Sequence, residues 1–182
     1  MSESSFLNPT KVLAQAGLHE GMQVADFAAA SGFFVRAAAR LVGETGVVWA
    51  IDQNRELLPR IKNVAFAEGL PHVEVVHGDP GKLKGTKLPD SSMDLVILAN
   101  ALFTYEHHDQ GTVLKEIERV LKPGGRAVVI DWSGSHGGLG PHVDHIITEG
   151  NFRKLFAQTH MVEVGSVPAG NYHWGLIIRK AA

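Results

Sequence analysis

The sequence predicts an α/β protein with a doubly wound, mostly parallel sheet, and three observations support this fold class. Short apolar runs alternate with segments of helical periodicity along most of the chain. The run at 47–51 is apolar throughout, as expected for a parallel strand covered on both faces. Two further apolar stretches, separated by a short turn, close the chain. The expected strands number seven and lie at 24–27, 47–51, 72–77, 95–100, 126–130, 161–167 and 172–179.

Composition indicates a single soluble domain over residues 1–182. The 17 Lys and Arg against 19 Asp and Glu give a net charge of −2, so no basic surface suggests a nucleic-acid partner. The chain has no cysteine, which excludes disulfides, thiolate metal ligands and a catalytic thiol. No signal-peptide pattern is evident, and no apolar stretch approaches the roughly 18 residues that span a membrane. We therefore expect a cytoplasmic protein.

The first part of the chain is organised around a strand, a turn of small residues and a helix. Asn8-Pro9-Thr10 predicts a short N-terminal helix within residues 1–20. The strand at 24–27 then leads through small residues into a helix expected at 35–42. Such a turn brings backbone against a ligand, and the helix start offers unpaired N–H groups. This is how α/β folds commonly open a nucleotide site.

Acidic residues follow the next two strands. Asp52 ends the strand at 47–51, where a carboxylate can accept hydrogen bonds from both hydroxyls of a ribose. The alternative for Asp52 is a helix N-cap, since a helix is expected at 54–68. The strand at 72–77 closes in Gly78-Asp79, followed by the turn signal Pro80-Gly81. Both acids are expected at the carboxyl edge of the sheet.

The fourth strand ends in Asn100, Ala101 and Leu102, again at the edge where parallel sheets bind ligands. Four side chains beyond it are candidates to border a substrate, with ordinary packing or exposure as the alternative: Phe103, Tyr105, His107 and His108.

An amphipathic helix is expected at 112–121, with Glu116 and Arg119 on its polar side. Lys122-Pro123-Gly124-Gly125 then predicts a glycine-based C-cap of the Schellman type before the fifth strand. The glycine-rich stretch within 133–147 is a candidate lid, and a further helix is expected at 148–158.

These segments resemble the class I S-adenosylmethionine (SAM) dependent methyltransferases over roughly residues 8–180. Asp26 and Gly32 match the ends of that family's first motif, Asp-x-Gly-x-Gly-x-Gly, and residues 118–126 match its Leu-Lys-Pro-Gly-Gly segment. The resemblance implies a Rossmann-like sheet with one antiparallel strand near the C-terminus. It also implies methyl transfer from SAM, with S-adenosylhomocysteine as product, to a small-molecule or lipid-like acceptor. Quinone C-methyltransferases belong to the most similar subgroup.

The resemblance also implies which residues bind the cofactor. The stretch from Asp26 to Gly32 would hold the methionine and ribose, Asp52 the ribose hydroxyls and Asp79 the adenine. The full set of expected contacts is Asp26, Phe27, Ala28, Ala30, Gly32, Asp52, Gln53, Gly78, Asp79, Pro80, Asn100, Ala101 and Leu102.

The sequence departs from the family at Ala28 and Ala30, where the first motif has glycine. Glycine tolerates positive φ and a close ligand, so two Cβ atoms should strain the turn or crowd the cofactor. Overpacking of about 1–3 kcal/mol would weaken binding about 5- to 150-fold. A non-catalytic or impaired protein that binds SAM or S-adenosylhomocysteine is therefore the second hypothesis. A nicotinamide-dependent oxidoreductase is the third, and the closing pair of strands and the Lys-Pro-Gly-Gly block argue against it.

No spacing identifies a catalytic base, and His145, Asp131 and Tyr105 are the candidates. Solvated loop histidines are the alternative, and in-line methyl transfer can proceed by positioning alone. His136, His142 and His145 with Asp131 and Asp144 offer metal-ligand chemistry, but a loop His-x-x-His spacing fixes no geometry, so we expect no metal. A homodimer is left open.

Overall fold

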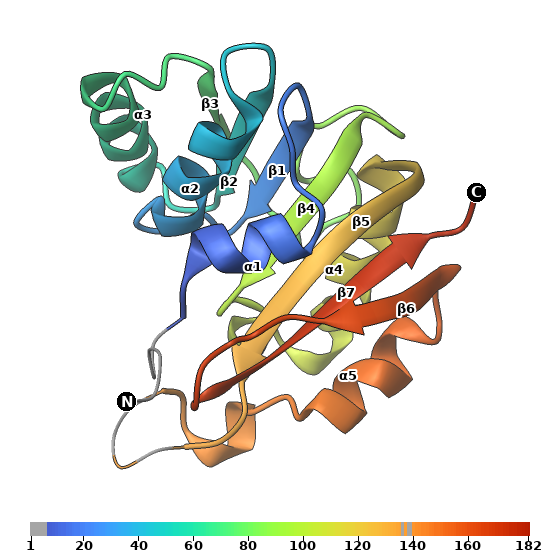
Figure 1. The fold of residues 1–182 in the computed structure, drawn as a ribbon. Helices are drawn as coiled ribbons and strands as arrows, with labels where there is room; N and C mark the ends of the chain where they lie inside the picture. Colours follow the sequence, from blue (N-terminus) through green and yellow to red (C-terminus); the bar gives the residue numbers. More distant parts are fainter. Residues whose placement is uncertain (1–6, 136, 138–139) are drawn as a thin grey trace, which may run out of the picture.

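The computed structural model describes residues 7–135, 137 and 140–182 and contains one seven-stranded sheet (Figure 1). The predicted α/β fold is confirmed, and the strand order is β3-β2-β1-β4-β5-β7-β6. The strands are β1 (Gln23–Phe27), β2 (Val47–Asp52), β3 (Val73–His77), β4 (Met93–Ala99), β5 (Leu121–Trp132), β6 (Met161–Ser166) and β7 (His173–Lys180).

The central strands are parallel, and β7 runs antiparallel to both of its neighbours, β5 and β6. The expected antiparallel strand near the C-terminus is therefore present. The order reverses between β1 and β4, where Asp26 pairs with Ile97. Loops that leave β1 and β4 diverge to opposite faces at this point, which opens a crevice at the carboxyl ends of the strands.

Helices cover both faces of the sheet, with α1, α2 and α3 on one side and α4 and α5 on the other (Figure 1). The Asn8 side chain caps α1 by accepting the Lys11 N–H at 3.1 Å, and Thr148 caps α5 through the Asn151 N–H. The helices are α1 (Pro9–Gln15), α2 (Phe33–Val42), α3 (Leu57–Ala67), α4 (His107–Val120) and α5 (Glu149–Phe156), with short 3-10 turns η1 (Leu102–Thr104) and η2 (Val143–His145).

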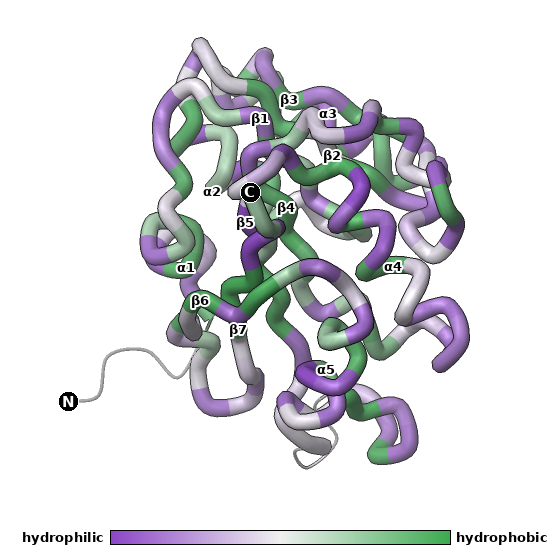
Figure 2. Tube along the Cα trace, turned by 90° about the vertical axis from the view of Figure 1, so that its right-hand side faces the viewer, coloured by the Kyte–Doolittle hydropathy of each residue, from purple (hydrophilic) through white to green (hydrophobic). Residues whose placement is uncertain are grey.

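Alternation along the strands divides the apolar core into two layers. In β4, Leu95 and Ile97 pack toward α1–α3, whereas Val96 and Leu98 pack toward α4 and α5. Figure 2 shows the apolar residues concentrated along the strands in the middle of the molecule. No described helix combines the length and apolar character needed to cross a bilayer.

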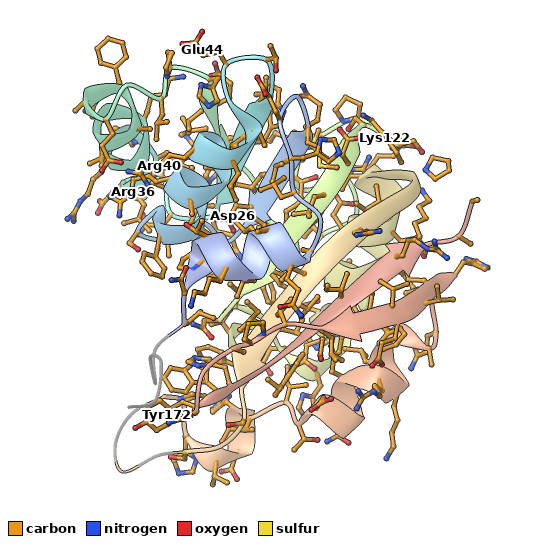
Figure 3. All side chains as sticks on the ribbon, viewed as in Figure 1. Asp26, Arg36, Arg40, Glu44, Lys122 and Tyr172 are labelled. Carbon is orange, nitrogen blue, oxygen red and sulfur yellow. The ribbon has the colours of Figure 1, made fainter. Side chains whose placement is uncertain are left out.

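The predicted Schellman cap after α4 is wrong. The helix starts at His107 instead of 112, and it ends at Val120 because Leu121 already has extended angles (φ −66°, ψ 136°). Residues 122–125 belong to β5, and Gly124, with φ +76°, lies where the pairing with β4 slips. The glycines therefore form a strand irregularity. Figure 3 places Lys122 at the opposite end of the sheet from Tyr172, far from the carboxyl edge.

Candidate cofactor site and acceptor cavity

The turn after β1 has the strained backbone that the two alanines predict. Ala28 has φ +62° and Ala30 has φ +47°, both in the left-handed region that favours glycine, and Gly32 follows with φ +74°. The Ala29 N–H donates to Ile51 O at 3.0 Å, which holds the turn over the end of β2. A left-handed conformation costs an ordinary L-residue about 1–2 kcal/mol. The turn thus keeps a backbone conformation that favours glycine, although alanines occupy it and glycines would relieve the strain.

Asp52 holds this turn from the neighbouring strand. Its Oδ2 accepts the Ala30 N–H at 2.9 Å, its Oδ1 accepts the Asn54 N–H at 2.8 Å, and the residue is 8% exposed. The alternative reading as a helix N-cap is wrong, because α3 begins at Leu57 with Glu56 at the cap position. The Asp52 carboxylate instead connects the first turn to the carboxyl end of β2.

Asp26 is a buried acid at the wall of a cavity of about 400 Å³, which also borders Ala28, Ala30 and Asn100. It lies on β1 beside α2, as labelled in Figure 3. Burial and then the nearby Asp52 carboxylate raise the pKa of Asp26 well above its usual value. Asn100 Oδ1 is also buried, and among the described residues no donor satisfies it. An acid and an acceptor without donors fit a bound cation such as the ammonium of a methionine group.

A second, smaller cavity of about 280 Å³ lies at the ends of β2 and β3. Gln53, Gly78 and Asp79 line it together with lysine side chains from the following loop. Asp79 Oδ1 accepts the Gly81 N–H at 2.9 Å, and its Oδ2 pairs with Lys82 Nζ at 3.1 Å. Asp79 and Asp26 thus line different cavities. Asp52 lies between them, because its carboxylate accepts the Ala30 N–H on one side and its backbone carbonyl accepts the Gly78 N–H on the other.

The other predicted cofactor residues are enclosed by protein. Phe27, Ala101 and Leu102 are buried in the apolar core, and Pro80 is also buried. Their contacts with the cofactor stay a prediction.

A cavity of about 500 Å³ lies beyond η1, between the segments 103–110 and 141–145. Tyr105 and His145 line it, as expected of substrate-facing residues, and so does His107, whereas His108 instead pairs with Asp109. Tyr105 also reaches the cofactor side, because its hydroxyl accepts a hydrogen bond from Gln53 at 3.3 Å. Burial raises the pKa of Tyr105 to about 12, so its hydroxyl stays protonated at neutral pH.

Gln110 was not anticipated from the sequence, because α4 was expected to start after it. It is buried, lines the same cavity and donates to the Tyr105 carbonyl at 3.0 Å. A polar residue in a polar stretch gives no signal of this contact. The candidate lid borders the cavity at its end, through residues 141–145, while residues 136 and 138–139 lie outside the described residues.

Asp131, the remaining candidate base, is fully buried at the end of β5 and is not among the residues that line this cavity. Its Oδ2 accepts the Phe103 N–H at 3.2 Å and its Oδ1 the Trp132 N–H at 2.8 Å. Burial raises the pKa of Asp131 to about 6, although the backbone donors oppose the shift. The carboxyl group thus ties η1 to β5.

We expect Asp131→Asn to change how stability depends on pH. A raised pKa in the folded state means that Asp131 contributes stability below its ordinary pKa and that this contribution is lost as pH rises through about 6. The shift corresponds to about 3 kcal/mol. The free energy of unfolding of the parent chain should therefore fall by about that amount relative to Asp131→Asn between about pH 4 and pH 7. Urea titrations measure it, and parallel pH curves for the two proteins would contradict it.

In the described part of the chain, no three His, Asp or Glu side chains are grouped so that they could hold an ion. His142 Nδ1 instead lies 3.2 Å from Asp144 Oδ2, with both side chains largely exposed. His136 lies outside the described residues.

Comparisons with known proteins point to one family. A family model described as "Methyltransferase domain" matches residues 24–125. The ubiquinone/menaquinone biosynthesis C-methyltransferase UbiE of Laribacter hongkongensis is 40% identical over 121 residues, which are 66% of this chain and 47% of that protein. The same enzyme of Cupriavidus necator is 34% identical over the same length. The chain spans about half the length of these curated relatives.

Solved structures share the fold over nearly the whole chain. A SAM-dependent methyltransferase from Aquifex aeolicus superposes with a TM-score of 0.85 at 28% identity, covering 96% of this chain and 90% of that one. The [4+2]-cyclase SpnF superposes at 0.79 with 16% identity, covering 96% and 80%, and shows the fold alone. Because the family model spans more than half of the chain and the sheet order agrees, the chain belongs to the class I SAM-dependent methyltransferases.

Proposed function

We propose that this protein transfers a methyl group from SAM to a small-molecule acceptor. The observation that carries the proposal is the buried Asp26 carboxyl beside the turn of the first motif. It shares a cavity with Asn100 Oδ1, which accepts no hydrogen bond from the described part of the chain. When bound, SAM supplies a methyl group on a positively charged sulfur. Asp26 would hold the methionine ammonium, Asp52 the ribose hydroxyls and Asp79 the adenine.

We infer that the acceptor binds in the cavity beyond η1. Aromatic, imidazole and amide side chains line it, namely Phe103, Tyr105, His107, Gln110, His142 and His145. Tyr105 connects the two sites, since its side chain lines the acceptor cavity and its hydroxyl contacts Gln53 on the cofactor side. A protonated phenol can donate a hydrogen bond to an acceptor oxygen, and the His145 imidazole is of a type that serves as a general base. The relatives named as quinone C-methyltransferases favour a hydroxylated ring as acceptor.

Calorimetry with S-adenosylhomocysteine tests the cofactor assignment through Asp26. A cation placed against a buried carboxyl of raised pKa favours its ionised form, so binding should release protons and affinity should rise with pH. Titration in buffers of different ionisation enthalpy measures this release. We expect Asp26→Asn to abolish it. Equal proton release by both proteins would rule out the Asp26 contact, and binding of NAD in place of S-adenosylhomocysteine would favour the oxidoreductase hypothesis.

The second candidate function is a non-catalytic or impaired protein that binds SAM or S-adenosylhomocysteine, and the left-handed φ angles of Ala28 and Ala30 favour impaired binding. An assay of labelled methyl transfer from SAM to a panel of hydroquinones and other phenols separates the two. Transfer to any of them, lost in Tyr105→Phe or His145→Ala, supports the enzyme. Binding of S-adenosylhomocysteine without transfer to any acceptor supports the binding protein.

A further inference from the structure

Glu116 on α4 is a fully buried carboxylate that lines none of the three cavities described above. It accepts five hydrogen bonds. Two come from the backbone N–H groups of Lys84 and Thr86, at 2.8 and 3.2 Å, and one from the Thr86 hydroxyl at 2.6 Å. The other two come from Arg119, whose Nε and Nη2 donate at 2.9 and 2.7 Å. Glu116 was expected on the polar, solvent-facing side of the helix, and this expectation is wrong.

The charge of Glu116 is retained despite its burial. Burial opposes ionisation, but the hydrogen bonds from Arg119, Thr86 and the loop backbone outweigh it and hold the pKa of Glu116 below its usual value. Arg119 also pairs with Asp90 and donates to the Leu88 carbonyl at 2.9 Å. A buried carboxylate with five donors is a fixed anchor, since losing any one donor leaves charge unsatisfied.

The loop that Glu116 anchors is the one that carries Asp79. The two anchored amides, of Lys84 and Thr86, flank Gly85, and the Gly85 carbonyl accepts the Asp79 N–H at 2.9 Å. The backbones of Gly85 and Asp79 are closely packed, because a Cβ on Gly85 would lie 2.1 Å from the Asp79 carbonyl oxygen. Lys84 and Lys87 have left-handed φ angles of +58° and +61°. Such strained residues persist where their surroundings hold them in place.

We propose that Glu116 is a positioning residue for the adenine-binding loop: it fixes Lys84 and Thr86, and through Gly85 it sets the position of Asp79. The inference rests on the proposed function, because it takes the cavity beside Asp79 as the adenine site. The positioning role predicts one effect that a general loss of protein stability would not produce. Loosening the anchor should weaken recognition of the adenine ring and leave recognition of the methionine and ribose unchanged.

The test compares two ligands on Glu116→Gln. S-adenosylhomocysteine carries the adenine, and S-ribosylhomocysteine lacks it. A glutamine amide adds donors that face Arg119 and the loop N–H groups, so the anchor weakens without loss of volume. We expect the affinity for S-adenosylhomocysteine to fall about 3- to 30-fold with that for S-ribosylhomocysteine unchanged. Hydrogen exchange of the Lys84, Gly85 and Thr86 amides should accelerate in the same variant.

Asp94→Asn is the matched control. Asp94 also accepts a backbone N–H, from Gln23 at 2.8 Å, and pairs with Lys122, but at the opposite edge of the sheet. It should leave both affinities and the loop exchange unchanged. If Glu116→Gln does not fold, Thr86→Val is the second variant. It removes the hydroxyl that donates to Glu116 and accepts from Arg119 Nη2 and the Leu88 N–H, and it should give a smaller effect with the same ligand selectivity.

The outcomes separate this inference from the proposed function. Equal losses for the two ligands in Glu116→Gln, or unchanged loop exchange, would overturn the positioning role while the unsubstituted chain still binds S-adenosylhomocysteine. Failure of the unsubstituted chain to bind S-adenosylhomocysteine would overturn the proposed function and the positioning role together.

Discussion

Asp52→Asn is expected to lower the affinity for S-adenosylhomocysteine about 30- to 700-fold. The carboxylate accepts the N–H groups of Ala30 and Asn54, and the proposed ribose hydroxyls would use its remaining lone pairs. Hydrogen bonds to a charged acceptor contribute about 1.5–3 kcal/mol each. An amide keeps one acceptor oxygen, so the substitution should cost about 2–4 kcal/mol of binding free energy in the hydrogen bonds to the ribose. Calorimetry on the folded variant measures the loss.

The control for this prediction is again Asp94→Asn, which removes the same charge and a hydrogen bond of the same kind far from the cofactor site. Its affinity should match that of the unsubstituted chain. An Asp52→Asn protein that is folded and binds S-adenosylhomocysteine as tightly as its parent would show that Asp52 only supports the turn. The ribose would then have to be held elsewhere.

Much of the fold could be predicted because its signals are local. The apolar run that became β2 and the two stretches that became β6 and β7 are each recognisable from a few adjacent residues. Periodicity also located α2 and α5 to within a few residues. The Lys-Pro-Gly-Gly segment shows the limit of such signals. Glycine after a helix predicts a cap, but whether Leu121 continues the helix or pairs with β4 depends on a strand almost thirty residues earlier.

The site was harder to predict than the fold, because a local pattern of residues does not show which side chains are buried by segments distant in the sequence. Glu116 has the charged side chain typical of an exposed position, yet the loop at 84–86 covers it completely. The same holds for Asp131, which looks like a free acid after a strand and is instead bonded to the backbone of η1. The family resemblance predicts Asp26, Asp52 and Asp79 as cofactor residues, but the placement of Asp26 and Asp79 in two different cavities depends on how the loops fold over the sheet edge.

The double substitution Ala28→Gly/Ala30→Gly is expected to stabilise the fold and strengthen cofactor binding together. Each alanine is held at positive φ, so glycine relieves about 1–2 kcal/mol per position. The greater entropy of an unfolded glycine returns about 0.5–1 kcal/mol of that. A net gain of about 1–2 kcal/mol in the free energy of unfolding should follow. Both alanines also line the cavity beside Asp26, so removing their methyl groups should raise the affinity for S-adenosylhomocysteine about 5- to 150-fold.

Ala29→Gly is the control for this prediction. It makes the same substitution in the same turn, but Ala29 is a buried residue that is not among those with positive φ. It removes a packed methyl group and adds chain entropy without relieving strain, so it should destabilise the protein by about 1–2 kcal/mol. Opposite signs for the two proteins in urea unfolding would show that backbone conformation, and not the loss of side-chain volume, controls this turn. The contrary result is that Ala28→Gly/Ala30→Gly destabilises the protein as Ala29→Gly does and that binding does not improve. The alanines would then be accommodated without strain, and the hypothesis that they weaken cofactor binding would be wrong.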